Sequence, residues 1–291
     1  MPYVCPTNGV ACVTNVCDPV INACKPIPDD TKCPCGQTCD ATLGCGNFCQ
    51  VKTCQGKVYQ CGDCMDNDGD CKIDSGDDQC LGPCDNTEDS FYGGIPGQKG
   101  PKCDVDCYFD QDSGHGNDNC YWDHRCDSLE ASPNYYPESW NGASCAYDPT
   151  FKLTPTLSCP QAQTTQSQVC TNYCGPLVPN GCDCFGCCQI PVPNTSTTVT
   201  VWLGSEDGNG NGSCNINSLT NPAKCEPCTQ VQGACLNTCD HCELCVGKTT
   251  LPPDCVSQVC PAGKQACGLP GQAACPTGAT CITGCCQANP G

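Results

Sequence analysis

The segment from residue 64 to residue 80, CMDNDGDCKIDSGDDQC, has the residue types and the spacing of a calcium loop. Counted from Asp66 as position 1, carboxylates fall at positions 1, 3, 5, 9 and 12, and a backbone carbonyl falls at position 7. Alternate residues of a tight turn point oxygens at one centre, and Ca²⁺ accepts about six to eight oxygens. The ligands expected from this pattern are Asp66, Asp68, Asp70, Lys72 (through its carbonyl), Asp74 and Asp77.

The pattern departs from the EF-hand loop at three positions. Gly69 stands at position 4, Cys71 replaces the glycine that makes the sharp turn at position 6, and position 12 is the shorter Asp77. We therefore expect disulfides through Cys64, Cys71 and Cys80 to pin the loop in place of flanking helices. In this it resembles the calcium loops of thrombospondin-type and dockerin-type repeats. The alternative is an acidic, solvated turn that binds no ion.

A second acidic stretch, CDVDCYFDQDSGHGNDNC, places Asp110, Asp112 and Asp118 at positions 1, 3 and 9 of a looser loop. It is a second candidate calcium loop, and the alternative is a plain surface turn. Calcium sites of extracellular modules have dissociation constants of about 10⁻⁴ to 10⁻³ M, so the expected role is structural.

Other chemistry receives less support from the sequence. The spacings in CDCFGCC (182 to 188) and CLNTCDHCELC (235 to 245) could hold zinc or an iron–sulfur cluster, but an oxidising compartment turns such cysteines into disulfides. The chain has three histidines, His115, His124 and His241, and none lies in a zinc-protease, nucleophile-elbow or P-loop motif. We therefore expect no enzymatic activity, and a structural role for WDHRC (122 to 126).

The amino-acid composition indicates the kind of fold that must position these groups. The 291 residues include 41 cysteines, 31 glycines and 26 prolines, with few aromatics. Cysteine at this density marks a disulfide scaffold in an oxidising compartment. The expected fold is a chain of small disulfide-rich modules, mostly loops with a few short strands and minimal helix, elongated overall. Because 41 is odd, at least one cysteine is a free thiol, a metal ligand or part of an interchain disulfide.

Uneven charge and aromatic content divide the chain into four expected modules. Residues 1–60 are N-terminal stapled loops, 61–150 an acidic, calcium-binding and aromatic-rich module, 151–254 a cysteine-rich module with one short β region, and 255–291 a C-terminal mini-module. Most of the net charge of −19 and ten of the aromatics fall in the second module. These aromatics form either a buried core, which we favour, or an exposed platform for sugars.

A few local elements can be predicted. Residues 197–203 are rich in β-branched types and bounded by Pro and Gly, which predicts a strand. Pro160 can begin a short helix, and Cys170 and Cys174 then lie one turn apart. GCCQ occurs twice, at 186–189 and 284–287, as a weak internal repeat.

Several phrases, DNDGDCKID, CLGPCDNTEDSFYGGIPGQ, CYFDQDSGHGNDNCYWDHRCD, PNGCDCFGCC and CPTGATCITGCCQ, resemble secreted cysteine-rich proteins of myxobacterial type that carry DNDGD calcium loops. The resemblance implies export, oxidation and a place at a bacterial outer surface. The expected location is extracellular or at the cell surface, with no signal peptide in this numbering. No apolar run is long enough for a membrane span, and the acidic chain repels nucleic acid.

Three functions stay open from the sequence. The favoured one is a structural subunit of an extracellular fibre or surface layer, rigidified by disulfides and calcium, that self-associates into a polymer and could use an interchain disulfide. The second is a calcium-dependent adhesion or carbohydrate-binding protein, for which the aromatics would have to be exposed. The third is a secreted hydrolase or inhibitor.

Overall fold

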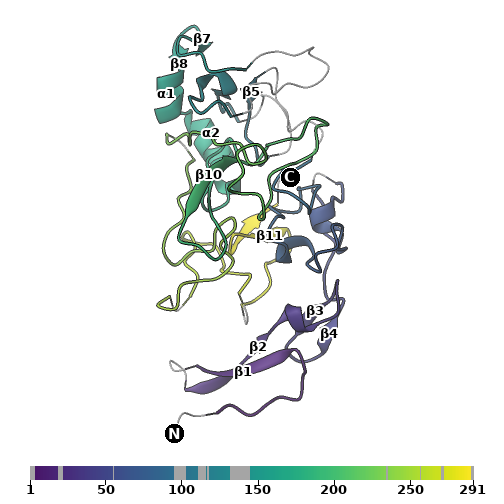
Figure 1. Ribbon diagram of the computed structural model, residues 1–291. Helices are drawn as coiled ribbons and strands as arrows, with labels where there is room; N and C mark the ends of the chain where they lie inside the picture. The colour runs from purple at the N-terminus through teal and green to yellow at the C-terminus, as the bar shows by residue number, and fades with distance from the viewer. Residues whose placement is uncertain are drawn as a thin grey trace.

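A computed structural model gives the arrangement of the chain. It describes residues 4–18, 22–54, 56–94, 103–110, 116, 118–131, 145–233, 235–255, 257–269 and 272–289. The molecule is elongated, with the N-terminal ribbons at one end and the strands β7 and β8 at the other (Figure 1). Regular structure consists of two-stranded sheets, two six-residue α-helices and short 3₁₀ turns within mostly irregular chain, which confirms the expected fold class.

Two small ribbons build the N-terminal end. The first pairs β1 (Val13–Asp18) with β2 (Ala23–Pro28), and the second pairs β3 (Thr38–Asp40) with β4 (Gly44–Gly46), both antiparallel. A two-stranded ribbon has marginal stability by itself, so cross-links must stabilise it. Three disulfides do so: Cys5–Cys24, Cys12–Cys39 and Cys33–Cys45.

The acidic segment that follows is an irregular chain with the 3₁₀ turns η2 (Gln60–Gly62) and η3 (Asp74–Gly76). Each cysteine expected to pin the loop does form a disulfide, and all three partners precede the loop in the chain. The pairs are Cys35–Cys71, Cys49–Cys64 and Cys61–Cys80. Two of them tie the acidic loop to the N-terminal segment.

The first helix begins where the sequence predicted it, and a second helix follows. Helix α1 (Cys159–Thr164) has Pro160 in its first turn, and a capping box between Ser158 and Gln161 closes its start. Helix α2 (Gln168–Tyr173) carries Cys170 and is followed by Cys174, one turn later. These two cysteines bond to Cys120 and Cys107, so two further segments of the chain are fastened to this helix, one within it and one at its C-terminal end.

The remaining sheets are four antiparallel pairs. The predicted strand at 197–203 is confirmed as β10, and its partner begins at the first GCCQ repeat. The last strand begins within the second GCCQ repeat. In each repeat the glycine before the strand, Gly186 or Gly284, has a positive φ. The pairs are β5 (Asp104–Val105) with β6 (Trp122–Asp123), β7 (Lys152–Thr154) with β8 (Leu157–Ser158), β9 (Cys187–Pro191) with β10 (Thr198–Trp202), and β11 (Ala279–Ile282) with β12 (Cys285–Ala288).

One apolar core joins the acidic and the cysteine-rich segments. It includes Phe91, Trp122, Phe185 and Leu203 together with ten or more buried cysteines. Tyr92 and Tyr108 are also buried, so the prediction of an aromatic core is confirmed for these described residues. Tyr147 is exposed, and Tyr135, Tyr136 and Trp140 lie outside the described residues.

Within the described part of the chain, both α-helices are far shorter than a bilayer crossing, and none meets the length and hydrophobicity of a membrane span.

Candidate metal site

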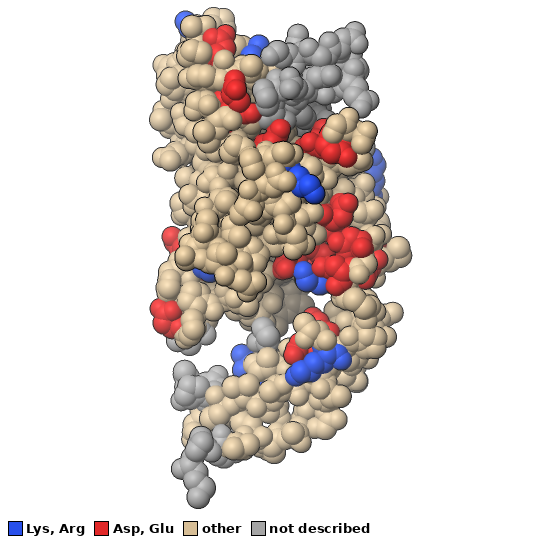
Figure 2. Space-filling model, viewed as in Figure 1, with Lys and Arg blue, Asp and Glu red and all other residues tan. Residues whose placement is uncertain are grey.

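Four of the predicted calcium ligands, Asp66, Asp68, Asp70 and Asp77, are electrostatic neighbours along the loop: Asp66 and Asp70 act on Asp68, and Asp68 and Asp70 act on Asp77. Burial raises the pKa of Asp68, and the neighbouring charges of Asp70 and Asp66 raise it further. Burial likewise raises the pKa of Asp77 to about 6, with Asp70 and Asp68 as its acidic neighbours. Mutual repulsion of this kind arises when carboxylates share one small volume. In Figure 2, acidic side chains gather along one edge of the molecule, at the height where Figure 1 draws this segment.

The backbone of the loop turns as a calcium loop requires. The Asp66 carboxylate accepts hydrogen bonds from the amides of Gly69 (2.7 Å) and Cys71 (3.1 Å). Gly69 has φ +84°, and Cys71, at the position of the EF-hand glycine, has φ +76°. A side chain in this left-handed region costs free energy, so other contacts must hold it there. The disulfide to Cys35 is such a contact.

Asp77 is the most unusual member of the group. Its side chain is only 4% exposed, and its Oδ1 accepts from the amide of Gln79 at 2.7 Å. Its Oδ2 is buried and has no hydrogen-bond partner. A buried carboxylate oxygen without a partner is costly unless a proton or a cation neutralises it.

Asp74 and Lys72 are placed differently from the group of four. The carboxylate of Asp74 accepts from the amide of Cys64 at 3.1 Å, and its charged neighbours are Asp63 and Lys52. The ammonium of Lys72 lies 3.2 Å from Asp70 Oδ2 and 2.9 Å from Asp78 Oδ2. Burial disfavours the charged form of Lys72, but these two carboxylates raise its pKa. The lysine thus neutralises part of the charge on the outer side of the loop.

Two buried acids beneath the loop, Asp85 and Glu88, were not predicted from the sequence. Asp85 is 5% exposed and accepts from the amides of Leu81 and Thr87, both at 3.1 Å. Glu88 is 1% exposed and accepts from the amides of Asn67 (2.7 Å) and Asp74 (3.0 Å). Burial raises the pKa of Glu88 to about 7, and that of Asp85 well above its usual range. The alternation of acids along the loop is the only local sequence signal of a ligand, and neither Asp85 nor Glu88 fits it.

Three described acids of the second acidic stretch are buried as well. Asp110 and Asp118 are fully buried, as is Asp106, which the spacing did not single out. Asp118 Oδ1 accepts from the amide of Cys120 at 3.2 Å, and its Oδ2 is buried without a hydrogen-bond partner. Asp112 lies outside the described residues. Residues 111–115 and 117, between these acids, lie outside the described residues, so the second calcium loop stays a prediction.

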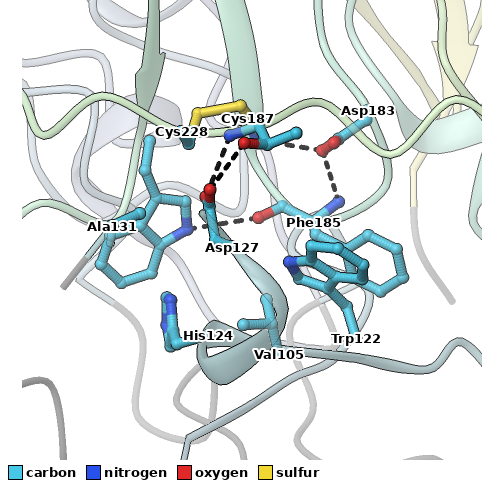
Figure 3. A pocket seen from close by; sticks show the side chains of 11 residues that line it. Val105, Trp122, His124, Asp127, Ala131, Asp183, Phe185, Cys187 and Cys228 are labelled. Atoms are coloured by element: carbon cyan, nitrogen blue, oxygen red, sulfur yellow. Dashed lines mark hydrogen bonds between the residues drawn. A yellow bond between two sulfur atoms is a disulfide. The ribbon is translucent and has the colours of Figure 1, made fainter. Parts of the chain in front are cut away.

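A small cavity lies between β6, β9 and β10, lined by Trp122, His124, Asp127, Asp183 and Trp202 among others (Figure 3). Its volume is about 10 Å³, which is room for one water molecule. Asp183 accepts from the amides of Phe185, Cys187 and Val231 at 2.7–3.0 Å. Its carboxylate therefore organises the loop before β9, and the cavity is too small for an organic ligand.

The WDHRC segment also has a structural role. Asp123 caps the 3₁₀ turn η4 (His124–Cys126), and both of its oxygens bond the Arg125 guanidinium at 2.6–2.8 Å. Arg125 in turn lies 3.7 Å over the ring of Phe151. Burial lowers the pKa of His124 to about 3, so the imidazole is neutral at physiological pH.

All 41 cysteines lie within the described residues, and 40 of them form disulfides inside the chain. Every cysteine of the two dense clusters, 182 to 188 and 235 to 245, is part of a disulfide. Their sulfurs are therefore not available as thiolates. The remaining cysteine is Cys17 on β1, which is partly exposed. Such dense bonding fits an oxidising, extracellular environment.

Comparisons of the chain with known protein families, curated proteins and solved structures find no significant match. The resemblance to myxobacterial secreted proteins therefore stays a prediction, and the function is argued from the geometry.

Proposed function

We propose that this protein is an extracellular structural subunit whose acidic segment binds calcium and whose N-terminal ribbon links neighbouring copies. The observation that carries the proposal is the disulfide pattern, since 20 bridges staple the small modules and Cys17 alone is left over, on a ribbon at one end of the molecule (Figure 1). Modules of this kind resist unfolding without a large apolar core.

The calcium part of the proposal rests on Asp77. Its buried Oδ2 has no hydrogen-bond partner. Asp77 belongs to a group of four carboxylates, which offer a metal only oxygen ligands. Hard oxygen donors in this number suit Ca²⁺ better than a transition metal. The proposed ligands are Asp66, Asp68, Asp70 and Asp77, with the carbonyl of Lys72. Asp74 would serve the loop by accepting from the amide of Cys64.

The self-association part rests on the surface of the N-terminal end. Cys17 faces Cys24 across the ribbon, but Cys24 is already bonded to Cys5. Several large apolar side chains near this end are exposed, among them Val4, Val16 and Leu43. Exposed apolar groups beside an accessible thiol favour contact with a second copy.

Electron microscopy of the native, non-reduced protein in millimolar calcium, repeated after chelation, tests the proposal. We expect ordered assemblies that fray or disappear when calcium is removed. Discrete monomers under both conditions would overturn the structural-subunit proposal. The adhesion alternative needs an aromatic platform, and most described aromatics between Phe91 and Trp122 are buried in the core.

A further inference from the structure

We infer that Glu88 is the positioning residue of the calcium site: it holds the loop in its ligating shape without touching the ion. The inference rests on the proposed function, because it concerns the calcium site proposed at Asp66, Asp68, Asp70 and Asp77.

Glu88 contacts the loop at three places. Its carboxylate accepts from the amide of Asn67, which lies between two proposed ligands, and from the amide of Asp74 halfway along the loop. Its own carbonyl accepts from the side-chain amide of Gln79 at 2.7 Å. The backbone amide of Gln79 in turn donates to Asp77 Oδ1. One residue thus fixes the beginning, the middle and the end of the loop.

The segment that carries Glu88 is itself fixed to the core. Phe91, three residues later, is fully buried, and its amide donates to the carbonyl of Cys214 at 2.8 Å. Gln79 Oε1 also accepts from the amide of Ile216 at 3.2 Å. The loop is therefore held against a rigid support, and not only by its own turns. A site built in this way keeps its ligands in place before the ion arrives, which lowers the cost of ordering them.

Both oxygens of Glu88 act as acceptors, so the carboxylate cannot be replaced by an isosteric amide. Glu88→Gln keeps one acceptor and turns the other into a donor that faces an N–H group. Either the Asn67 amide or the Asp74 amide then loses its partner. Glu130→Gln is the matched control, since it makes the same change at an exposed residue outside the acidic loop.

The experiment uses the full oxidised chain and two readouts. In chelator, hydrogen exchange is measured at the amides of Asn67 and Asp74, and we expect Glu88→Gln to speed it at least tenfold at one or both amides. With Tb³⁺ as the probe, luminescence lifetimes in H₂O and D₂O count the water molecules on the bound ion. We expect at least one additional water in Glu88→Gln, a calcium affinity about tenfold weaker, and no change in Glu130→Gln.

The outcomes separate the two proposals. If the wild type binds neither Ca²⁺ nor Tb³⁺, the calcium site and this inference are both overturned. If the wild type binds and Glu88→Gln matches it in water count and affinity, only the inference is overturned. Should Glu88→Gln fail to fold, Glu88→Asp replaces it: its shorter arm keeps the charge but reaches only one amide, and the same gain in bound water is expected.

Discussion

At the residue scale, burial gives neighbouring acids different properties. Asp77 is 4% exposed and has a pKa of about 6, whereas Asp78 is partly exposed and pairs with Lys72 at the surface. The same side chain can therefore be a ligand candidate at one position and a surface ion-pair partner at the next. Surface pairs of this kind contribute little to stability.

This contrast gives a prediction. Asp77→Asn should weaken calcium binding by about tenfold or more, roughly 1.4 kcal/mol, because the amide keeps the hydrogen bond from Gln79 but loses the charge that faces the ion. Asp78→Asn should change the affinity by much less. Isothermal titration calorimetry with Ca²⁺ measures both, and equal losses in the two variants would contradict the proposed ligand set.

A second prediction concerns pH in the absence of calcium. The pKa values of Asp77 (about 6) and Glu88 (about 7) lie above their ordinary values of 3.8 and 4.5. Between about pH 4 and pH 7 the folded chain therefore holds protons that the unfolded chain has released, so the free energy of unfolding decreases as pH rises, by on the order of 2 kcal/mol.

The melting temperature in chelator should accordingly be higher at pH 5 than at pH 8. Calcium should reverse the trend, because the ion binds the deprotonated carboxylates and adds its binding free energy to the folded state. A calcium-free melting temperature that rises from pH 5 to pH 8 would contradict the assignment of these acids.

The sequence predicted the loop better than it predicted the surroundings of the loop. Alternation of Asp66, Asp68 and Asp70 is a local signal, and the structure does bring these residues together with Asp77. The different surroundings of Asp74 and the presence of Glu88 under the loop depend on contacts with residues 14 to 25 positions away. Such contacts leave no periodic trace in a sequence.

At the element scale, the same turn recurs where the chain reads Cys-Pro-x-Gly. The prolines at 34, 261 and 276 each accept, through the carbonyl, a hydrogen bond from the amide three residues later. The glycines at 36, 263 and 278 have φ between +73° and +86°. A glycine with positive φ in the third place is what a type II turn requires. The strand at 197–203 and the helix start at Pro160 were predictable for similar local reasons, whereas the partner of each strand was not.

Two glycines allow a matched test of backbone strain and packing. A Cβ at Gly263 meets no atom within 4 Å, so Gly263→Ala should cost only the strain of its positive φ, about 1–2 kcal/mol. A Cβ at Gly186 lies 2.8 Å from the ring of Tyr108, so Gly186→Ala should cost about 1–3 kcal/mol more. Urea unfolding of the oxidised proteins measures the difference, and equal losses would show that the ring of Tyr108 moves aside.

At the scale of the whole molecule, disulfides join the N-terminal segment to the acidic loop, and one apolar core joins the acidic and the cysteine-rich segments. The elongated form places β1 and β2, with the one free thiol, at an end of the molecule (Figure 1). The odd number of cysteines was visible in the sequence. Which cysteine is left over was not, because pairing depends on the fold and 41 cysteines allow a very large number of combinations.

We therefore predict that Cys17→Ser abolishes covalent linkage between copies. Non-reducing electrophoresis of the native protein should show species of higher mass that are absent in this variant. Thr14→Ser, a change at an exposed residue of the same strand that keeps its hydroxyl, should keep them. Linked species that persist in Cys17→Ser would mean that another cysteine exchanges its partner.

The vicinal cysteines at the start of β9 affect how this chain can mature. Cys187 bonds to Cys228 and Cys188 to Cys182, and the two sulfurs lie in different apolar clusters because successive side chains point to opposite faces of a strand. Adjacent thiols have nearly equal access to both partners until the strand has formed. Correct oxidation at this point therefore has to follow the pairing of β9 with β10, and premature oxidation would trap a swapped isomer that only an isomerase or a reductant could release.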